Sequence, residues 1–541
     1  MAVRITTYSS LEKILPDSAP QKGAQSGVML CNETFSFQTD LYLEPTNTLF
    51  NTFRLSVDGA LKDYVSVFET EYVPVVKGHY PETDEYILSK QSGLYPDVLT
   101  PYPLNKAFVL HAERHKSFWI KVKGELPCGT HTVEVVLSNY ENQELQRAIF
   151  QLEVIDYHLP QCTIPIHSWL HCDCICEQHG VQPYSKKFYS IFGEYLKSMR
   201  EHGVNTLYVP LFTPALDTEK GTYRKNVQLV DVIKNGEKYQ FQWDKLAYFI
   251  DYAKGFGFER FELCHLFTQW GAKHAPKIMA KVNGRNKRIF GWDTVADGEE
   301  YATFLKAFLP PLVRLLKKKE VRACFHLSDE PGDVFEQYAK IRALVKPYVQ
   351  DYPIVDACPP EYQQKGLVDC AFVSTDIAEK HLDYIENCAV YYCCGQYQKY
   401  LSNRFITMPS LRNRVLGLQL YANGVKGFLH WGYNFYHSSG SRFIINPFLV
   451  NDGKGAYPAG DCFIVYPDIL GGGVFESLRN EVFNEAIQDY RLMTALEDEK
   501  GKQYVSALLK DFGVNGFCEY PRDEQAYLLF INACKKKLKE K

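Results

Sequence analysis

Up to about residue 158, short runs that alternate polar and apolar residues follow one another without a helical period. The runs 117–122 and 132–137 are examples, and turn residues such as Gly129 separate them. Alternation with a period of two is typical of strands with one buried face. We therefore expect an N-terminal β-sandwich domain over residues 1–158.

From residue 159 onward, apolar strand-like runs alternate with segments whose apolar positions recur at helical spacing, and long loops follow the second and third runs. The eight runs are 163–170, 205–210, 261–266, 321–325, 354–356, 370–374, 389–393 and 426–431. Eight strand–helix units in succession predict an α/β fold with a (β/α)8 barrel of the TIM type. We expect this barrel, with a C-terminal helical extension, to occupy residues 159–541.

Two adjacent carboxylates, Asp329 and Glu330, follow the fourth predicted strand, and Pro331 opens a helical pattern behind them. Active sites of such barrels lie at the carboxyl ends of the strands. The residues alone leave two interpretations open, a catalytic pair or the cap of the following helix. The other Asp-Glu pairs of the chain lie in charged segments, which favours solvated acidic surfaces there.

Further polar and aromatic side chains fall at the predicted strand ends. Carboxylates, an amide and aromatic faces together suit a sugar, although each alone has an ordinary role in packing or capping. The expected substrate-binding residues are His171, Asp173, Tyr208, Trp270, Tyr392, Trp431 and Asn434.

Composition and charge exclude several classes of protein. With 60 basic and 64 acidic residues, the net charge of −4 gives no basic surface for nucleic acid. The first residues lack the apolar core of a signal peptide, and no stretch reaches transmembrane length, so we expect no membrane insertion. Sixteen scattered cysteines are interpreted as reduced thiols of a cytoplasmic protein. Nothing in the sequence indicates the oligomeric state.

The segment 171–179 contains cysteines, histidines and acidic residues at close spacing. Zinc sites usually combine such a cluster with a distant second pair of ligands, and no convincing partner pair is present. We therefore expect no metal and no cofactor. Phosphate-binding motifs are absent as well, since the glycines 471–473 lack a preceding strand and a following Lys-Ser/Thr pair.

Several motifs give the chain a specific resemblance over roughly residues 110–495. The matching stretches are 167–173, 267–272, 289–294, 326–331, 427–432, 460–461 and 465–467. As a set they resemble glycoside hydrolase family 123 and its close relatives, formerly described as a domain of unknown function.

The resemblance implies a retaining, exo-acting β-N-acetylgalactosaminidase that uses substrate-assisted catalysis. Its partner would be a carbohydrate, a glycan or glycolipid with a terminal β-linked 2-acetamido sugar. By resemblance, Glu330 protonates the leaving oxygen and later activates water, while Asp329 holds the acetamido N–H and stabilises an oxazolinium intermediate. Ordinary retaining glycosidases place two carboxylates about 5 Å apart across the scissile bond, an arrangement that neighbours in sequence cannot adopt.

Two alternatives remain. One is a glycosidase for another sugar, with Glu330 as the acid and a distant carboxylate such as Asp173, Asp293 or Asp376 as base or nucleophile. The other is a non-catalytic glycan-binding protein on a degenerate barrel. The paired role of Asp329 and Glu330 requires the strand to end before them, since alternate residues of a strand face opposite ways.

Overall fold

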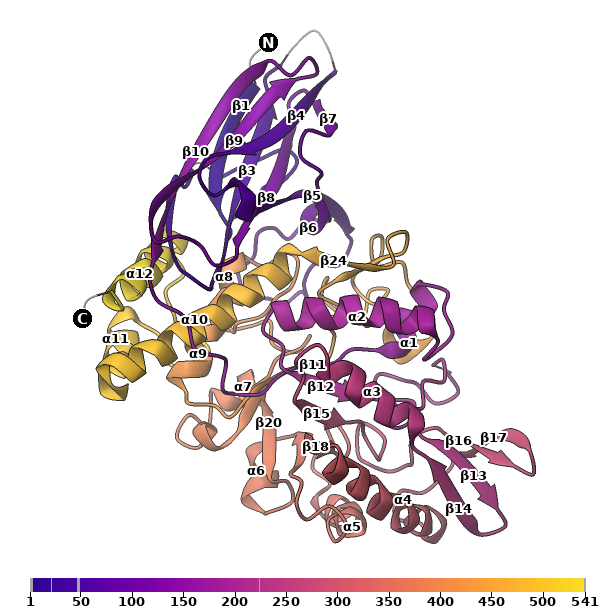
Figure 1. The fold of residues 1–541 in the computed structure, drawn as a ribbon. Helices are drawn as coiled ribbons and strands as arrows, with labels where there is room; N and C mark the ends of the chain where they lie inside the picture. The colour runs from indigo at the N-terminus through magenta and orange to yellow at the C-terminus, as the bar shows by residue number, and fades with distance from the viewer. Residues whose placement is uncertain (1–2, 21, 46–48, 223, 540–541) are drawn as a thin grey trace.

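The N-terminal part of the chain forms two β-sheets (Figure 1). The computed structural model describes residues 3–20, 22–45, 49–222 and 224–539. One sheet has seven strands, in the order β1 (Val3–Ser9), β3 (Thr34–Leu43), β8 (His115–Lys123), β5 (Val65–Val75), β6 (Gly93–Pro101), β24 (Gly473–Ser477) and β23 (Tyr466–Asp468). The other has five, in the order β2 (Ser26–Leu30), β10 (Glu144–Ile155), β9 (Gly129–Asn139), β4 (Phe50–Asp58) and β7 (Ala107–His111).

Strands from both sheets contribute to one hydrophobic core. β3 contributes Phe37 and Leu41, β8 contributes Phe118, and β9 contributes Val133 and Val135, all fully buried. Every second residue of these strands enters the core, as the pleat of a strand requires. The alternation seen in the sequence therefore reports a real buried face.

Eight parallel strands close a barrel in the middle of the chain. Their order is β11 (Ile166–Ser168), β12 (Thr206–Val209), β15 (Arg260–Leu263), β18 (Arg322–His326), β19 (Ile354–Ala357), β20 (Cys370–Ser374), β21 (Ala389–Tyr391) and β22 (Phe428–His430). The last strand pairs in parallel with the first, Leu429 opposite His167, which closes the barrel. Each of the eight predicted strands overlaps one of these.

Helices follow the barrel strands and lie around them (Figure 1). They are α1 (Cys172–Gln178), α2 (Lys186–Glu201), α3 (Asp244–Lys254), α4 (Glu299–Lys318), α5 (Phe335–Val345), α6 (Pro360–Gln364), α7 (Thr375–Ala378), α8 (Ser410–Arg414) and α9 (Leu416–Ala422). Short 3₁₀ turns are η1 (Lys62–Tyr64), η2 (Ile385–Asn387) and η3 (Ser439–Ser441). α2 shows why these segments are helical. Phe188, Phe192 and Leu196 bury one face, and the Ser185 side chain caps the start.

A four-stranded sheet extends from the loops after β12 and β15. Its order is β14 (Lys238–Gln242), β13 (Asp231–Asn235), β16 (Ile278–Val282) and β17 (Arg285–Phe290). The sequence predicts only long loops here. The hairpins were missed because exposed charged residues, as at 285–288, hide the alternation of their strands.

After the barrel the chain returns to the N-terminal sheets. β24 pairs antiparallel with β6, Ser477 opposite Val98, and α10 (Leu478–Lys500) lies between the sheets and the barrel (Figure 1). α11 (Lys502–Phe512) and α12 (Glu524–Lys537) follow. Lys535 of α12 donates a hydrogen bond to the Val28 carbonyl of β2 at 3.0 Å.

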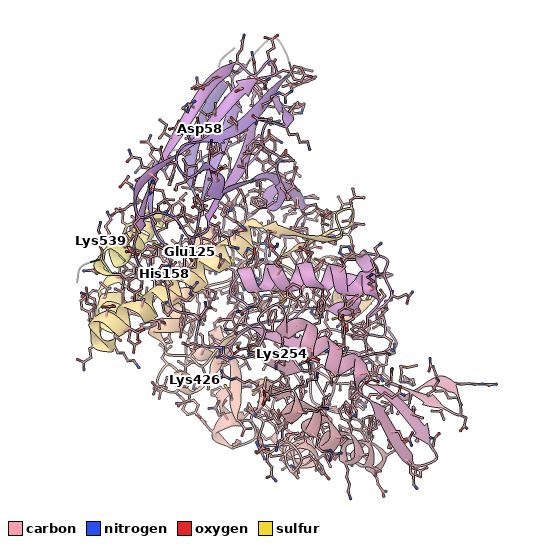
Figure 2. The ribbon with its side chains drawn as sticks, in the orientation of Figure 1. Asp58, Glu125, His158, Lys254, Lys426 and Lys539 are labelled. Atoms are coloured by element: carbon pink, nitrogen blue, oxygen red, sulfur yellow. The ribbon has the colours of Figure 1, made fainter. Side chains whose placement is uncertain are left out.

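The mixed α/β class, a closed parallel barrel and an N-terminal β-rich region are confirmed. The domain division at residue 158 stays a prediction, because strands from both sides of it share the seven-stranded sheet. His158 itself lies between β10 and β11 and pairs with Glu125 at 3.0 Å on the surface (Figure 2). No helix in the described part of the chain is long and apolar enough to cross a bilayer. All sixteen cysteines are free thiols.

Candidate active site

A pocket of about 590 Å³ lies where the barrel strands end. Its aromatic walls are Trp169, Trp270, Tyr391, Trp431 and Tyr457. Its polar groups are Asp217, Gln269, Asp329 and Glu330. Trp169 follows β11, Tyr391 ends β21 and Trp431 follows β22, so the carboxyl ends of strands far apart in sequence meet here.

Asp329 and Glu330 both line this pocket, because the fourth strand ends before them. β18 stops at His326, and Glu330 has a left-handed backbone with φ of 45°. Trp270, which faces the pair, is also left-handed, with φ of 57°. Such backbone is costly outside glycine and gathers at functional sites. The geometric requirement of the paired role is met.

The loop after β15 and the ends of β19 and β21 hold the acidic pair in place. The Asp329 carbonyl accepts the backbone N–H of Trp270, and the backbone N–H of Glu330 donates to the Ala357 carbonyl, each at 3.0 Å. Gln269 Nε2 donates to Asp329 Oδ2 at 2.6 Å. The hydroxyl of Tyr391 donates to Glu330 Oε1 at 2.8 Å. Each carboxylate therefore has its own side-chain donor.

The two carboxylates differ in burial. Asp329 is 5% exposed, whereas Glu330 is half-buried. Burial, together with the like charge of Glu330, raises the pKa of Asp329 well above its usual range. The raised pKa favours the neutral form of Asp329.

Each pocket tryptophan has its indole N–H tied to a carboxylate. Trp169 Nε1 donates to Glu262 Oε2 at 2.9 Å and Trp431 Nε1 to Asp461 Oδ2 at 3.1 Å. Trp270 Nε1 donates to Glu330 Oε2 at 3.3 Å. These bonds fix the ring planes, so the walls are rigid before any ligand arrives. Flat, rigid aromatic faces are suited to the apolar faces of sugars.

A buried charge cluster supports the pocket from inside the barrel. Glu262 accepts hydrogen bonds from His167 Nδ1 and His326 Nδ1, each at 2.7 Å. Although burial lowers the pKa of His326, the carboxylates Asp356 and Glu262 raise it to about 10. Asp356 accepts the backbone N–H of Ser328 at 2.9 Å. The imidazolium and its two carboxylates thus anchor both Trp169 and the turn that carries the acidic pair.

Four of the nine predicted site residues line the pocket, namely Asp329, Glu330, Trp270 and Trp431. Tyr208 is buried behind the Trp169 ring, where its hydroxyl bonds His265 Nδ1 at 2.9 Å. Tyr392 is fully buried against Phe428 and His430. Its neighbour Tyr391 faces the pocket instead, because adjacent strand residues face opposite ways.

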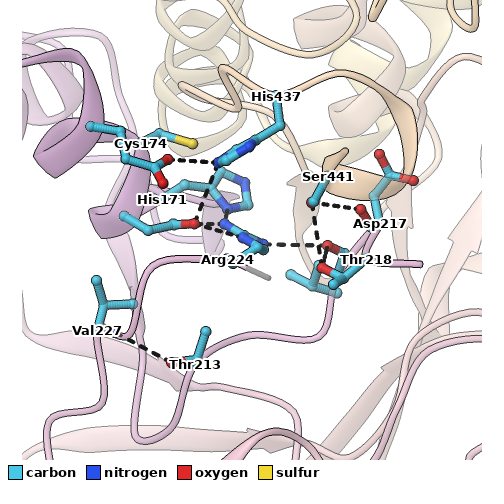
Figure 3. A network of polar contacts seen from close by, with 12 residues as sticks. His171, Cys174, Thr213, Asp217, Thr218, Arg224, Val227, His437 and Ser441 are labelled. Carbon is cyan, nitrogen blue, oxygen red and sulfur yellow. Dashed lines mark hydrogen bonds and ion pairs between the residues drawn. The ribbon is translucent and has the colours of Figure 1, made fainter. Parts of the chain in front are cut away.

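His171 lies in a buried polar network with Arg224 (Figure 3). Asp173 and Asn434 are buried in the same network. Arg224 forms two hydrogen bonds of 2.7 Å with the carboxylate of Asp173, and its charge outweighs burial and lowers the pKa of that group. Arg224 also donates to His171 Nδ1, so the Nε2–H of His171 donates to the Trp431 carbonyl, each at 2.9 Å. Burial and Arg224 lower the pKa of His171 to about 3, which keeps the ring neutral.

Asn434 links the same two loops. Its Oδ1 accepts the backbone N–H of His171 at 2.7 Å and its Nδ2 donates to the His171 carbonyl at 3.2 Å. Of these three residues, His171 bonds the Trp431 carbonyl, and none of the three lines the pocket.

Asp217, Gln269, Tyr391 and Tyr457 were not singled out from the sequence. Asp217 and Gln269 lie in the long loops after β12 and β15, which no strand pattern marks. Gln269 is part of a motif quoted for the family resemblance, and that was the one signal available. Tyr457 comes from the stretch after β22 and donates to Asp217 Oδ2 at 2.6 Å.

The distant carboxylates of the alternative mechanism lie elsewhere. Asp173 is held by Arg224, and Asp293 pairs with Arg288 at 2.8 Å on an exposed loop. Asp376 accepts from Gln396 at 2.6 Å and does not line the pocket. Asp217 is the further carboxylate that does line it.

Comparison with known proteins agrees with this geometry. A family model described as "Glycoside hydrolase 123, catalytic domain" matches residues 169–496, more than half of the chain. The chain belongs to glycoside hydrolase family 123. The matched range includes all nine predicted site residues and every barrel strand except β11. Membership of family 123 makes the protein a glycosidase.

One solved structure supports the fold. It concerns glycolipid glycan hydrolysis by a family 123 glycoside hydrolase from Clostridium perfringens. It is similar over 100% of this chain and 98% of that one, with a TM-score of 0.75 and 13% identity. A β-glucuronidase from Parabacteroides merdae shares 10% identity over 89% of this chain and 51% of that one. Its TM-score of 0.33 is too low to support a common fold. No curated protein compared with the chain matches it.

Proposed function

We propose that this family 123 enzyme is a retaining, exo-acting β-N-acetylgalactosaminidase that works by substrate assistance. The supporting observation is that Asp329 and Glu330 are chain neighbours that line one aromatic pocket, with the strand ended at His326. Neighbouring carboxylates approach the sugar from the same side, which suits an internal nucleophile rather than a second enzyme carboxylate.

In the first step Asp329 accepts the N–H of the substrate's 2-acetamido group. The carbonyl oxygen of that group attacks C1, and the C1–oxygen bond to the leaving group breaks. Glu330 gives its proton to the departing oxygen. In the second step Glu330 takes a proton from water, whose oxygen attacks C1 and opens the oxazolinium ring. The two displacements at C1 retain its configuration.

The pKa of Asp329 fits this assignment. Without substrate, burial and the charge of Glu330 raise the pKa of Asp329 and favour its protonated form. An acetamido N–H supplies a further donor and stabilises the ionised form. Glu330 is the group that we assign as general acid to the leaving oxygen.

The remaining parts of the proposal rest on family membership and free thiols. The galacto configuration and a glycolipid or other glycan substrate follow from the resemblance, and the barrel would be of the TIM type. Sixteen free cysteines support a reducing compartment, the cytoplasm.

One observation favours a second candidate, a glycosidase that acts on sugars without a 2-acetamido group. Asp217 is a further carboxylate that lines the pocket, and the second candidate would use it as base or nucleophile. Its Oδ2 accepts from Tyr457 at 2.6 Å and its Oδ1 from the backbone N–H of Gly440 at 3.2 Å. Because both oxygens are already engaged, we assign Asp217 to binding of a sugar hydroxyl.

The test uses three chromogenic substrates, the β-N-acetylgalactosaminide, the β-N-acetylglucosaminide and the β-galactoside. We expect wild type to cleave the first best and the galactoside not at all. Glu330→Gln should lose turnover even of these aryl glycosides, because no base remains to activate water in the second step. Cleavage of the plain galactoside that disappears in Asp217→Asn would favour the second candidate instead.

A further inference from the structure

Four different metal-ligating side chains meet beside the active site. Asp173, Cys174 and Glu177 lie on α1, directly after the first barrel strand, and His437 lies in the loop after the last one. One ligand atom from each lies within 4.8 Å of all the others. Asp173, Cys174 and His437 are each at most 2% exposed. Figure 3 shows the His437 ring pointing at the α1 residues.

We propose that Asp173, Cys174, Glu177 and His437 form a structural binding site for a divalent metal ion of the zinc class.

The state of His437 is the second, independent observation. His437 is buried, and its Nε2 forms an ion pair with Glu177 Oε2 at 2.9 Å and lies 3.6 Å from Asp173 Oδ2. Among the described residues, however, no contact of either ring nitrogen or of Glu177 Oε2 has the geometry of a hydrogen bond. Buried polar groups without a well-formed hydrogen bond are rare and costly, and a shared metal ion would satisfy these atoms.

The donor set selects the class of metal. A thiolate, an imidazole and carboxylates together suit zinc, whereas calcium and magnesium prefer oxygen ligands alone. The backbone N–H of Tyr436 lies 3.3 Å from Cys174 Sγ, where it stabilises a thiolate. With a 2+ ion, three anionic ligands and the guanidinium of Arg224, the charges sum to zero. Arg224 holds Asp173 through two bonds and orients it, as outer partners of metal ligands do.

The geometry describes a closed site. Ligand atoms around tetrahedral zinc lie about 3.3–3.8 Å apart. On binding, Glu177 Oε2 and His437 Nε2, which are 2.9 Å apart, would therefore separate slightly, and the pairs of ligand atoms that lie further apart would draw together. Four protein ligands leave no open position, which assigns a structural role. The ion would join α1 to the loop after β22, across the seam between the first and last barrel strands. His437 contacts Phe435, which packs on Trp431 of the pocket, so the ion would also brace that wall.

The sequence hides this site. The segment 171–179 has closely spaced ligands but no second pair nearby, which led to the expectation of no metal. The missing ligand, His437, comes from the other end of the barrel and is recognisable only in the fold.

The test is zinc and cobalt binding by the untagged full chain. We expect about one Zn²⁺ per chain by elemental analysis, and a thiolate-to-cobalt charge-transfer band after substitution with Co²⁺. Cys174→Ser should remove the band and weaken zinc binding at least about tenfold. Cys176→Ser, a buried cysteine of the same helix outside the cluster, is the matched control and should keep both.

Two results overturn the proposal. One is a wild-type protein that, after reconstitution with Zn²⁺ or Co²⁺, shows neither a bound ion nor the band. The other is a band or a zinc affinity that Cys174→Ser leaves unchanged. If Cys174→Ser does not fold, His437→Gln takes its place with the same two outcomes. These readouts do not depend on hydrolysis, so they stand apart from the proposed glycosidase activity.

Discussion

Gln269 is expected to control the ionisation of Asp329. Its Nε2 donates to Asp329 Oδ2 at 2.6 Å, and its Oε1 accepts the backbone N–H of Asp217 at 2.8 Å. The second bond fixes which end of the amide faces the carboxylate. Gln269→Met keeps a similar volume and removes the donor. The change leaves Asp329 without the one side-chain donor that the described residues give it.

The expected loss follows from the strength of that bond. A hydrogen bond to a charged group contributes about 1.5–3 kcal/mol, which corresponds to a fall in kcat/KM of about 10- to 150-fold. Loss of the donor also raises the pKa of Asp329 further. Because the mechanism needs this carboxylate ionised, the acidic limb of the pH–rate profile should move to higher pH.

The assay is the pH dependence of kcat/KM on the chromogenic β-N-acetylgalactosaminide, with thermal unfolding measured in parallel. Gln396→Met is the matched control, since Gln396 likewise donates to a carboxylate, Asp376 at 2.6 Å, and accepts a backbone N–H at 2.9 Å. The role given to Asp329 is refuted if folded Gln269→Met keeps kcat/KM within about threefold of wild type, a difference of less than about 1 kcal/mol, and its acidic limb does not shift.

Two further predictions concern neighbouring groups. Tyr391→Phe removes the donor to Glu330 and should lower kcat/KM about tenfold or more. Tyr392→Phe should leave kcat/KM nearly unchanged, because the Tyr392 hydroxyl has no hydrogen bond among the described residues. Equal losses of kcat/KM in the two variants would contradict the role given to Tyr391. His326 is charged in the fold up to a pKa of about 10, so the stability it contributes is complete below pH 6.5 and lost as the pH rises towards 10. The free energy of unfolding should fall between pH 6.5 and pH 9.5 in wild type, and should fall less in Glu262→Gln. Equal falls in the two proteins would exclude His326 as the cause.

The barrel was predictable because each of its strands is an apolar run followed by a helical period. The strands are buried on both faces, so composition and spacing mark them. The side sheet was not predictable in this way, since β17 exposes Arg285, Asn286, Lys287 and Arg288 to solvent. Only scattered residues of this sheet, among them Val232, Ala280 and Phe290, join the barrel core, so the apolar pattern of its strands is weak.

The active site was predictable only in part. Asp329 and Glu330 stand out because they follow a buried strand directly. Tyr392 was named in place of Tyr391 because the predicted strand ran to residue 393, whereas β21 ends at Tyr391. A displacement of one residue reverses the face of a side chain. Gln269 reaches the pair from a loop, and the sequence carries no signal of where a loop folds back.

The charged and polar residues around Arg224 show a second limit. His171 and Asp173 follow the first strand, as pocket residues do, yet they turn into a buried network. Arg224 comes from the loop after β12, and its charge holds Asp173 away from the pocket. Strand-end position predicts which edge of the barrel a residue occupies. It does not predict which partner the side chain finds there.

The measurement that tests substrate assistance most directly is hydrolysis of aryl β-galactosaminides whose N-acetyl group carries none, one, two or three fluorines. Fluorine withdraws electrons from the carbonyl oxygen that we propose as the nucleophile. The account predicts that kcat falls with each added fluorine, and that the fall persists when the leaving group is a good one. A rate independent of fluorine content would contradict it and assign the nucleophile to the enzyme, with Asp217 as the first carboxylate to replace.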